Sequence, residues 1–247
     1  MKKIRLWKRD YDIIEDIKHG FYTTSQLAKL YFSSRKKAAE RLKLLFKAGL
    51  TDRFQAPLND VRGKPEYVYC SKSGKIPKNY SHVKHNLAIT DFYVWLIEKT
   101  KQDRDMVAKF YFGTTLEDKA LLGGLLLPDA LFILEKGDKK LLYFAEIDLG
   151  TETLRSGSNY SFEGKLDLYS ELFDSGEYNS FLTHKFVGFR LLCVFDSEKR
   201  MRNFLGAAKE KSADFVLATT FGKLNEKDLL MKAWLNTEGK LVNIVGK

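Results

Sequence analysis

The spacing of apolar residues along the first fifty positions predicts three helices, because these residues recur at intervals of three and four. The expected helices cover residues 11–18, 26–32 and 34–48. Asp10, the run Thr23-Thr24-Ser25 and the pair Ser33-Ser34 each precede one of them and offer helix-capping side chains. Gly20 and Gly49 end the first and the third helix.

Two short apolar runs follow the third helix and are typical of strands. They cover residues 50–54 and 66–69, and the segment 57–64 between them contains Pro, Asn-Asp and Gly, which favour a turn. Three helices followed by such a hairpin are typical of a winged helix-turn-helix domain. We therefore expect this domain over residues 1–75, followed by a polar linker at about residues 71–80.

The rest of the chain, residues 76–247, alternates helices and strands after an expected hairpin. The expected strands cover 107–112, 130–134, 141–148, 186–195, 215–219 and 241–245, and the expected helices begin near 81, 162, 197 and 224. Strands that alternate with helices after an antiparallel hairpin imply a mixed sheet covered on both faces. The predicted fold class is therefore α+β or α/β, with a winged helix followed by an α/β/α domain.

Positive charge is confined to the first third of the chain. The formal net charge is +10, yet residues 1–80 hold 19 Lys and Arg against 8 Asp and Glu, while the remainder holds 23 against 24. This asymmetry predicts that the N-terminal domain binds a polyanion, with double-stranded DNA as the expected partner. The alternative is that the protein is simply basic.

A winged helix places the start of its third helix in the major groove of DNA. The expected contacts to base edges or phosphates come from Ser34, Arg35, Lys37 and Arg41, and those to backbone phosphates from Arg53, Arg62 and Lys64. The alternative is that these residues form a solvated helix face. Only Glu40 interrupts the charge of that face, which favours the DNA interpretation.

Composition narrows the class of protein. The two cysteines, Cys70 and Cys193, lie far apart, which excludes a disulfide scaffold or a zinc ribbon and fits a reducing cytoplasm. No apolar run approaches the roughly 18 residues that a membrane span needs, so we expect no membrane partner. No secretory signal follows the basic start of the chain. The sequence leaves open whether the protein forms a homodimer.

Three carboxylates lie at one end of the expected hairpin. Glu146 and Asp148 are two residues apart on a strand, so they share a face at a separation of roughly 7 Å. Asp129 stands at the open end of the partner strand and can converge on them. Such a group needs a cation, and hard divalent ions such as Mg²⁺ prefer carboxylate oxygens. The pattern predicts a metal site for phosphodiester cleavage; the alternative is three solvated acids.

The same residues carry a resemblance to a known family. Pro128-Asp129-Ala130 on one strand and Glu146-Ile147-Asp148 on the next resemble the PD-(D/E)xK nuclease fold. With the N-terminal winged helix and the run Lys165-Leu166 followed by Tyr169, the chain looks like the replication-relaxation family of plasmid and mobile-element proteins. The resemblance implies plasmid replication and relaxation of plasmid DNA. If the protein is catalytic, the expected ion at the three carboxylates is Mg²⁺ or Mn²⁺.

One departure from the nuclease pattern keeps two functions open. The pattern expects Lys two residues after the strand acid, where this chain has Asp148, and Lys165 on the following helix could supply the missing cation. Lys165 and Tyr169 are four apart and share a helix face, although Lys165 could equally be an exposed lysine. The first function is a metal-dependent DNA nuclease or nickase. The second is a non-catalytic origin-binding or regulatory protein whose degenerate nuclease-like domain serves assembly.

Overall fold

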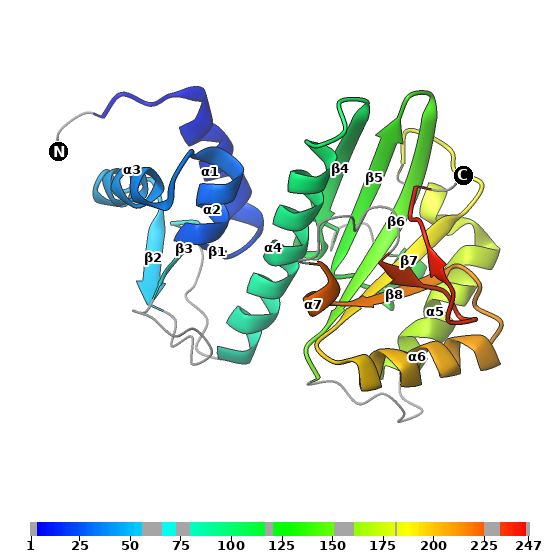
Figure 1. The fold of residues 1–247 in the computed structure, drawn as a ribbon. Coiled ribbons are helices and arrows are strands. Elements are labelled where there is room, and N and C mark those ends of the chain that lie inside the picture. Colours follow the sequence, from blue (N-terminus) through cyan, green and yellow to red (C-terminus); the bar gives the residue numbers. More distant parts are fainter. Residues whose placement is uncertain are drawn as a thin grey trace. The chain divides into compact units, whose positions relative to one another are not determined.

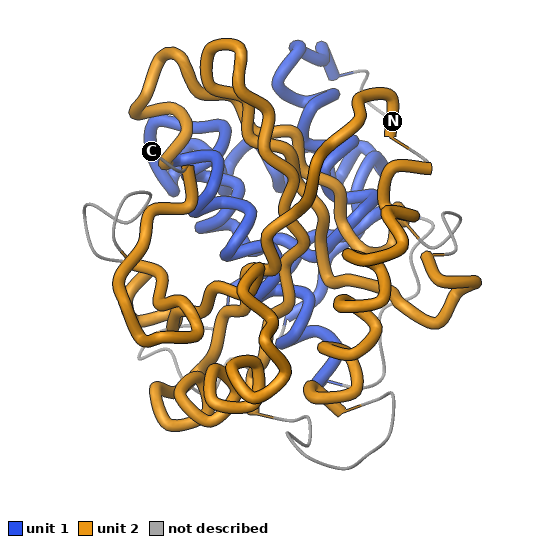
Figure 2. The backbone as a smooth tube through the Cα atoms, turned by 90° about the vertical axis from the view of Figure 1, so that its right-hand side faces the viewer, with its two compact units in different colours: residues 1–98 blue, residues 99–247 orange. Residues whose placement is uncertain are grey.

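A computed structural model describes residues 4–55, 66–72, 80–116, 121–150, 161–180, 182–224 and 233–245 (Figure 1). They divide into two compact units, residues 1–98 and 99–247, which Figure 2 separates by colour. The long helix α4 (Tyr80–Thr100), which the sequence pattern placed in the second domain, falls almost entirely in the first unit. The fold is mixed α and β.

The first unit begins with the three helices that the apolar spacing predicts: α1 (Lys8–His19), α2 (Thr24–Tyr31) and α3 (Arg35–Lys47). Thr23 and Gln26 cap α2 reciprocally, because the Thr23 hydroxyl accepts from the Gln26 backbone while Gln26 Oε1 accepts from the Thr23 backbone. Ser34 caps α3, and its hydroxyl accepts from the backbone N–H of Lys37 at 3.3 Å. Gly49, which follows α3, has a φ of +70°.

A small antiparallel sheet completes this unit. Its strands β1 (Tyr22–Thr23), β2 (Asp52–Gln55) and β3 (Tyr67–Cys70) are ordered β1-β3-β2. The apolar pattern did not predict β1, because a strand of two residues is too short to show a periodic signal. Residues 57–64, the expected hairpin tip, lie outside the described residues.

Hydrogen bonds from α2 explain why α4 belongs to the first unit. The Gln26 side-chain amide donates to the Leu87 carbonyl at 3.1 Å and to the Asp91 carboxylate at 2.7 Å. On the same helix, Val83 and Leu87 pack with Val68 of β3 in one apolar cluster. The helix is therefore an integral part of this unit.

The second unit is built on a mixed seven-stranded sheet ordered β10-β9-β8-β7-β6-β5-β4. Its strands are β4 (Met106–Phe112), β5 (Ala130–Lys136), β6 (Lys139–Asp148), β7 (Phe189–Phe195), β8 (Val216–Thr220), β9 (Trp234–Leu235) and β10 (Leu241–Val242). The hairpin β5–β6 is antiparallel, as predicted, whereas β6, β7 and β8 run parallel.

The helices of this unit are α5 (Phe162–Ser175), α6 (Glu198–Glu210) and α7 (Phe221–Leu224), with 3₁₀ turns at Gly113–Thr115, Leu121–Gly124 and Glu177–Asn179. Side chains of α5 and α6, including Leu166 and Phe204, form one core cluster with Leu142 and Phe144 of β6. The alternate β6 residues Tyr143 and Ile147 are also buried, so this strand is buried on both faces. Among the described residues, no helix has both the length and the apolar character to cross a membrane.

Candidate functional site

The structure places Asp129 and Glu146 next to each other at one end of the β5–β6 hairpin. Ala130 stands opposite Ala145 in this ladder, so one further step pairs Asp129 with Glu146. Beyond this pair, the Ile147 backbone N–H donates to a side chain: Asp129 Oδ2 accepts from it at 2.7 Å. Two of the three predicted acids are thereby brought to one position of the sheet.

Gly113 holds the Asp129 segment in place. Its backbone N–H donates to the Asp129 carbonyl at 2.8 Å, and a Cβ at this position would lie 2.3 Å from the Pro128 carbonyl oxygen. Any other residue would push the Pro128-Asp129 segment away. Sequence reasoning missed this glycine, and its place directly after a predicted strand is the only signal that could have indicated it.

Two side chains of α5 reach the Glu146 carboxylate, which is only 1% exposed. Lys165 Nζ lies 2.9 Å from Oε2, and the Tyr169 hydroxyl donates to Oε1 at 2.6 Å. Ser161 caps α5 through the Gly164 backbone at 3.0 Å, which fixes the turn from which Lys165 extends. Lys165 is therefore a partner of the buried acid, and its side chain is 21% exposed.

Electrostatics distinguish Glu146 from an ordinary ion-paired acid. Burial raises its pKa to about 7; the charge of Lys165 opposes this effect, and the negative charge of Asp129 adds to it. Burial also raises the pKa of Tyr169 well above its ordinary value. The phenol therefore stays protonated and donates a hydrogen bond to Glu146. The carboxyl group can thus change its charge near neutral pH.

Asp148 lies on the same face of β6 but has different partners. Its carboxylate is 1% exposed, and its Oδ2 accepts from Arg200 Nε at 2.9 Å and Nη2 at 2.6 Å. Its Oδ1 accepts from the Gly150 backbone at 2.7 Å. Sequence reasoning missed Arg200, although the cap Ser197 already placed it in the first turn of a helix after a neighbouring strand.

The predicted set of three metal ligands is not assembled. Within the part of the chain that the structure describes, no group of three or more His, Cys, Asp or Glu side chains could hold a metal ion. Protein cations already pair with Glu146 and Asp148. The pair Asp129 and Glu146 still fits the hard oxygen donors of Mg²⁺, which binds proteins through one or two carboxylates.

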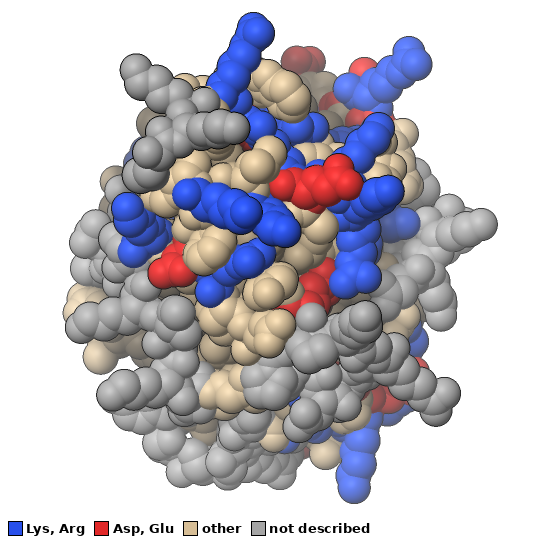
Figure 3. All heavy atoms as spheres, turned by 90° about the vertical axis from the view of Figure 1, so that its left-hand side faces the viewer, with Lys and Arg blue, Asp and Glu red and all other residues tan. Residues whose placement is uncertain are grey.

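In the first unit, α3 presents a row of exposed cations. Arg35, Lys36, Lys37, Lys43 and Lys47 are exposed, while Ala38, Leu42 and Leu45 face the core. Figure 3 views the side on which α3 and β2 lie and shows Lys and Arg in the majority among its charged side chains. We call this row the α3 basic face.

Arg35 lies at the start of this face, with its Nε 3.4 Å from Glu66 Oε1. The same Glu66 oxygen accepts from the backbone and hydroxyl of Ser25. Ser34 is exposed and serves as the cap of α3. Glu66 therefore links the beginnings of α2 and α3.

Two of the predicted DNA-contacting arginines are engaged inside the unit. Arg41 donates through Nε and Nη2 to the fully buried Asp10 at 2.9 and 2.5 Å, and its guanidinium lies 4.6 Å from the centre of the Trp7 ring. Arg53 lies over the rings of Phe46 and Tyr67, at 4.4 and 3.9 Å from their centres. Arg62 and Lys64 lie outside the described residues.

The family model for replication-relaxation matches residues 17–183, which is more than half of the chain. The chain belongs to the replication-relaxation family. This confirms the family that the sequence resembled, and it supports a function related to plasmid or mobile-element replication. The match contains α3, Asp129, Glu146 and Lys165, and it ends before Arg200. Comparisons with curated proteins and with solved structures gave no match.

Proposed function

We propose that this protein binds double-stranded DNA in plasmid or mobile-element replication, and that its first unit is a winged helix whose α3 enters the major groove. The observation that carries the proposal is the α3 basic face. Its first turn consists of Arg35, Lys36 and Lys37, all exposed, and contains no acid. A groove-reading helix places this same turn against base edges and phosphates.

The position of these cations argues for an external anion. The N-terminus of a helix carries a partial positive charge, so basic residues in the first turn lower its stability and acidic residues raise it. Three cations in the first turn of α3 are therefore unfavourable for the isolated helix. A DNA phosphate at this end would be stabilised by both the side chains and the helix terminus.

Arg41 and Arg53 have a different part in this proposal. Arg41 holds α3 through Asp10 of α1, and Arg53 contacts the rings of Phe46 and Tyr67, so both position the elements around the groove-binding face. The groups proposed to contact DNA are those of the α3 basic face. Ser34 serves first as the cap that starts this helix.

Binding to a 30-base-pair duplex of mixed sequence, followed by fluorescence anisotropy at several salt concentrations, tests the proposal. The double variant Lys36→Gln with Lys37→Gln should bind about tenfold more weakly at 0.1 M salt. Its slope of log K against log salt should fall by about two, because each lost phosphate contact contributes about 0.9.

The matched control is Lys18→Gln with Lys29→Gln, which removes two exposed lysines elsewhere in the unit. This control should bind duplex as the wild type does. An affinity of the wild type that does not change with salt, or an equal loss in both double variants, would contradict the proposal.

A second candidate function, hydrolysis of one strand of the bound DNA, is favoured by the grouping of Asp129, Glu146 and Lys165. An acid directly before β5, an acid on the adjacent β6 and a nearby lysine resemble the PD-(D/E)xK constellation, with the lysine supplied here from α5. Asp129 and Glu146 would hold Mg²⁺ or Mn²⁺, which supplies Lewis-acid polarisation of the phosphate and a hydroxide at neutral pH.

The surrounding side chains would prepare Glu146 for this role. Tyr169 orients the carboxylate, and Lys165 places a positive charge where a phosphate would gain negative charge. Because the pKa of Glu146 is about 7, the ionised form that can bind a cation increases as the pH rises through neutrality. Activity should increase over the same range. Asp148 is not included as a ligand, because two nitrogens of Arg200 and the Gly150 backbone donate to its two oxygens.

A nicking assay on supercoiled plasmid with Mg²⁺ or Mn²⁺ tests this second function. Asp129→Asn and Glu146→Gln should each lower the rate by about 100-fold or more, whereas Glu171→Gln, an exposed acid on α5, should not change it. No nicking by the wild type with either metal would contradict this second function and leave the duplex-binding function.

A further inference from the structure

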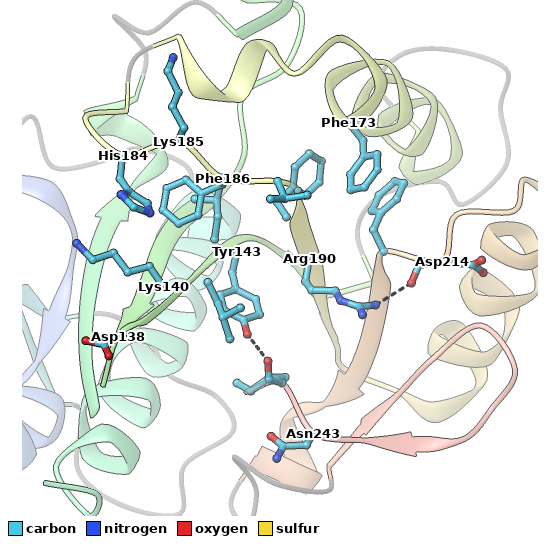
Figure 4. Close-up of a pocket in the computed structure, with 17 residues that line it drawn as sticks. Asp138, Lys140, Tyr143, Phe173, His184, Lys185, Phe186, Arg190, Asp214 and Asn243 are labelled. Carbon is cyan, nitrogen blue, oxygen red and sulfur yellow. Dashed lines mark hydrogen bonds between the residues drawn. The ribbon is translucent and has the colours of Figure 1, made fainter. Parts of the chain in front are cut away.

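The second unit contains a pocket at the end of the sheet opposite to Glu146 and Asp148. Its volume is about 750 Å³, and it is lined by the first residues of β6 and β7 and by the segment before β8 (Figure 4). Lys140 in its wall and Glu146 are six residues apart on β6, so roughly 20 Å separates them at about 3.3 Å per residue. The pocket is therefore distinct from the candidate nicking site.

Aromatic rings form one wall of the pocket. Phe173 of α5 stacks on Phe215 with ring centroids 5.1 Å apart and planes 10° apart, and 37% of Phe173 is exposed. A Cβ on Gly188 would lie 3.1 Å from the Phe173 ring, so the absence of a side chain there lets the ring lie close to the backbone. An apolar ring is thus held in place while remaining open to a ligand.

Two cations of the pocket bind backbone carbonyls rather than carboxylates. Lys185 Nζ donates to the Asn179 carbonyl at 3.0 Å, and Arg190 Nη1 donates to the Asp214 carbonyl at 2.9 Å. Across the residues for which the structure gives positions, neither cation forms an ion pair with an acid. In Figure 4 the Asp214 side chain points away from the Arg190 guanidinium. Both positive charges are therefore available to an anion.

The other charged groups of the pocket are one lysine and two acids. Lys140 adds a third cation, and its Nζ lies 3.6 Å from Glu135. The acids in the lining are Asp138 and Asp214, and Asn243, which directly follows β10, adds a neutral polar side chain. The site thus combines a flat apolar surface, an amide and two cations, Lys185 and Arg190, that donate to backbone carbonyls.

We propose that this pocket binds a nucleotide of single-stranded DNA, with the base against the Phe173 ring and the phosphate on Arg190. Single-stranded nucleic acids are bound by this combination of aromatic stacking and cationic contacts to the backbone. A volume of about 750 Å³ suits a ligand of nucleotide size. The Asn243 side-chain amide offers its N–H donors to the base edge, because its Oδ1 already accepts from the Val245 backbone at 2.8 Å.

This second DNA site goes beyond the proposed duplex binding, because it uses different residues in the other unit. It adds a place where an unpaired strand is held. Either site can exist without the other, and separate variants distinguish them.

The test measures anisotropy of a labelled ten-nucleotide oligo(dT) on the full chain that carries Lys36→Gln and Lys37→Gln, so that the α3 basic face contributes little. In this background, Arg190→Gln and Phe173→Leu should each weaken oligo(dT) binding by about tenfold. The matched controls are Arg202→Gln, an exposed arginine of α6, and Tyr111→Leu, an exposed aromatic residue of β4. Both controls should bind as their parent does.

Arg190 is exposed, so its variant tests the site even if Phe173→Leu disturbs the stacked rings. Competition with thymidine monophosphate separates two sources of the same chemistry: displacement of oligo(dT) identifies a free nucleotide, and no displacement identifies the strand itself. Wild-type affinity in both pocket variants, equal loss in the controls, or no binding of either probe by the parent would overturn the proposal. Duplex affinity in the otherwise wild-type chain should not change with Arg190→Gln.

Discussion

Each unit contains a carboxylate that is almost completely buried against a cation, yet the pairs of Asp10 and of Glu146 behave in opposite ways. Asp10 of α1 is 0% exposed and pairs with Arg41, whereas Glu146 of β6 is 1% exposed and pairs with Lys165. The pKa of Asp10 lies below its ordinary value, and that of Glu146 is raised to about 7. The first pair is a fixed structural contact, while the second can change its protonation state.

The number and kind of partners explain this difference. Burial alone would raise the pKa of Asp10, but two N–H groups of Arg41 and the Trp7 backbone donate to its carboxylate and together lower it. At Glu146 burial dominates, because Lys165 provides a single charged donor and Asp129 adds a second negative charge nearby. A buried acid with a perturbed pKa and a like-charged neighbour is typical of a functional site.

The largest effect should come from removing the cation of the structural pair. Arg41→Ala leaves an ionised carboxylate buried with no charged partner, which should lower the free energy of unfolding of the first unit by about 3–5 kcal/mol. Denaturant unfolding with circular dichroism measures the change. Arg35→Ala, an arginine with 64% of its side chain exposed on the same helix, should cost less than about 1 kcal/mol. Equal losses in the two variants would show that Asp10 does not depend on its partner.

The second prediction concerns pH. The folded state holds the proton of Glu146 more tightly than the unfolded state, since its pKa is about 7 instead of 4.5. Its contribution to stability is therefore complete below pH 4.5 and is lost as the pH rises through 7, with a total of up to about 3 kcal/mol. Asp10 acts in the opposite sense, because its lowered pKa stabilises the fold above 3.8 and this stability is lost in stronger acid.

Glu146→Gln isolates this contribution, since the amide keeps the shape of the side chain and does not titrate. The difference in unfolding free energy between wild type and variant should change by about 1–3 kcal/mol between pH 5 and pH 8, with the wild type losing stability relative to the variant. Glu171→Gln, on the exposed side of α5, should show no such change. A constant difference between wild type and Glu146→Gln would place the titration elsewhere.

A third prediction concerns the lysine that pairs with Glu146. Lys165→Met removes the cation beside Glu146, and the pKa of this carboxyl group should rise further because burial and Asp129 then act with less opposition. The variant should lose about 1–2 kcal/mol at pH 8 and much less at pH 6, where Glu146 can take up a proton instead. Lys211→Met, whose partner Asp167 has a side chain that is 63% exposed, should give a small loss at both values.

The elements were more predictable than the partners of their charged side chains. The limits of α3 were predicted within one residue at each end, because local capping and periodicity decide where a helix begins and ends. The signals were Ser34, Gly49 and the apolar spacing between them. Arg41 lies on the same helix and looked like its exposed basic neighbours. Its ion pair with Asp10 joins residues 31 positions apart, and no local sequence pattern indicates such a contact.

The same contrast holds at the acid end of the second sheet. The two-residue alternation placed Glu146 and Asp148 on one face of β6, and both side chains do lie beneath helices that cover that face. Alternation could not show that one acid meets α5 and the other meets α6. That division depends on where the helices begin, which the caps Ser161 and Ser197 determine.

The smallest expected effects come from removing the helix caps Ser161 and Ser34, one in each unit. Ser161 is buried and caps α5 at 3.0 Å, whereas Ser34 is exposed and caps α3 at 3.3 Å. Ser161→Ala should therefore lower the free energy of unfolding by about 1 kcal/mol and Ser34→Ala by about 0.5 kcal/mol. Thermal or denaturant unfolding of the two variants measures both values.

Duplex binding by the Ser34 variant decides between two roles for this residue. If Ser34 acts only as a cap, Ser34→Ala and Ser34→Gly should keep duplex affinity within about twofold of the wild type, because glycine is nearly as good as serine at a helix N-cap. If its hydroxyl contacts DNA, both variants should lose affinity by the same larger factor, although only alanine weakens the cap. Lys37→Gln provides the reference, since its loss of affinity should increase as salt is lowered.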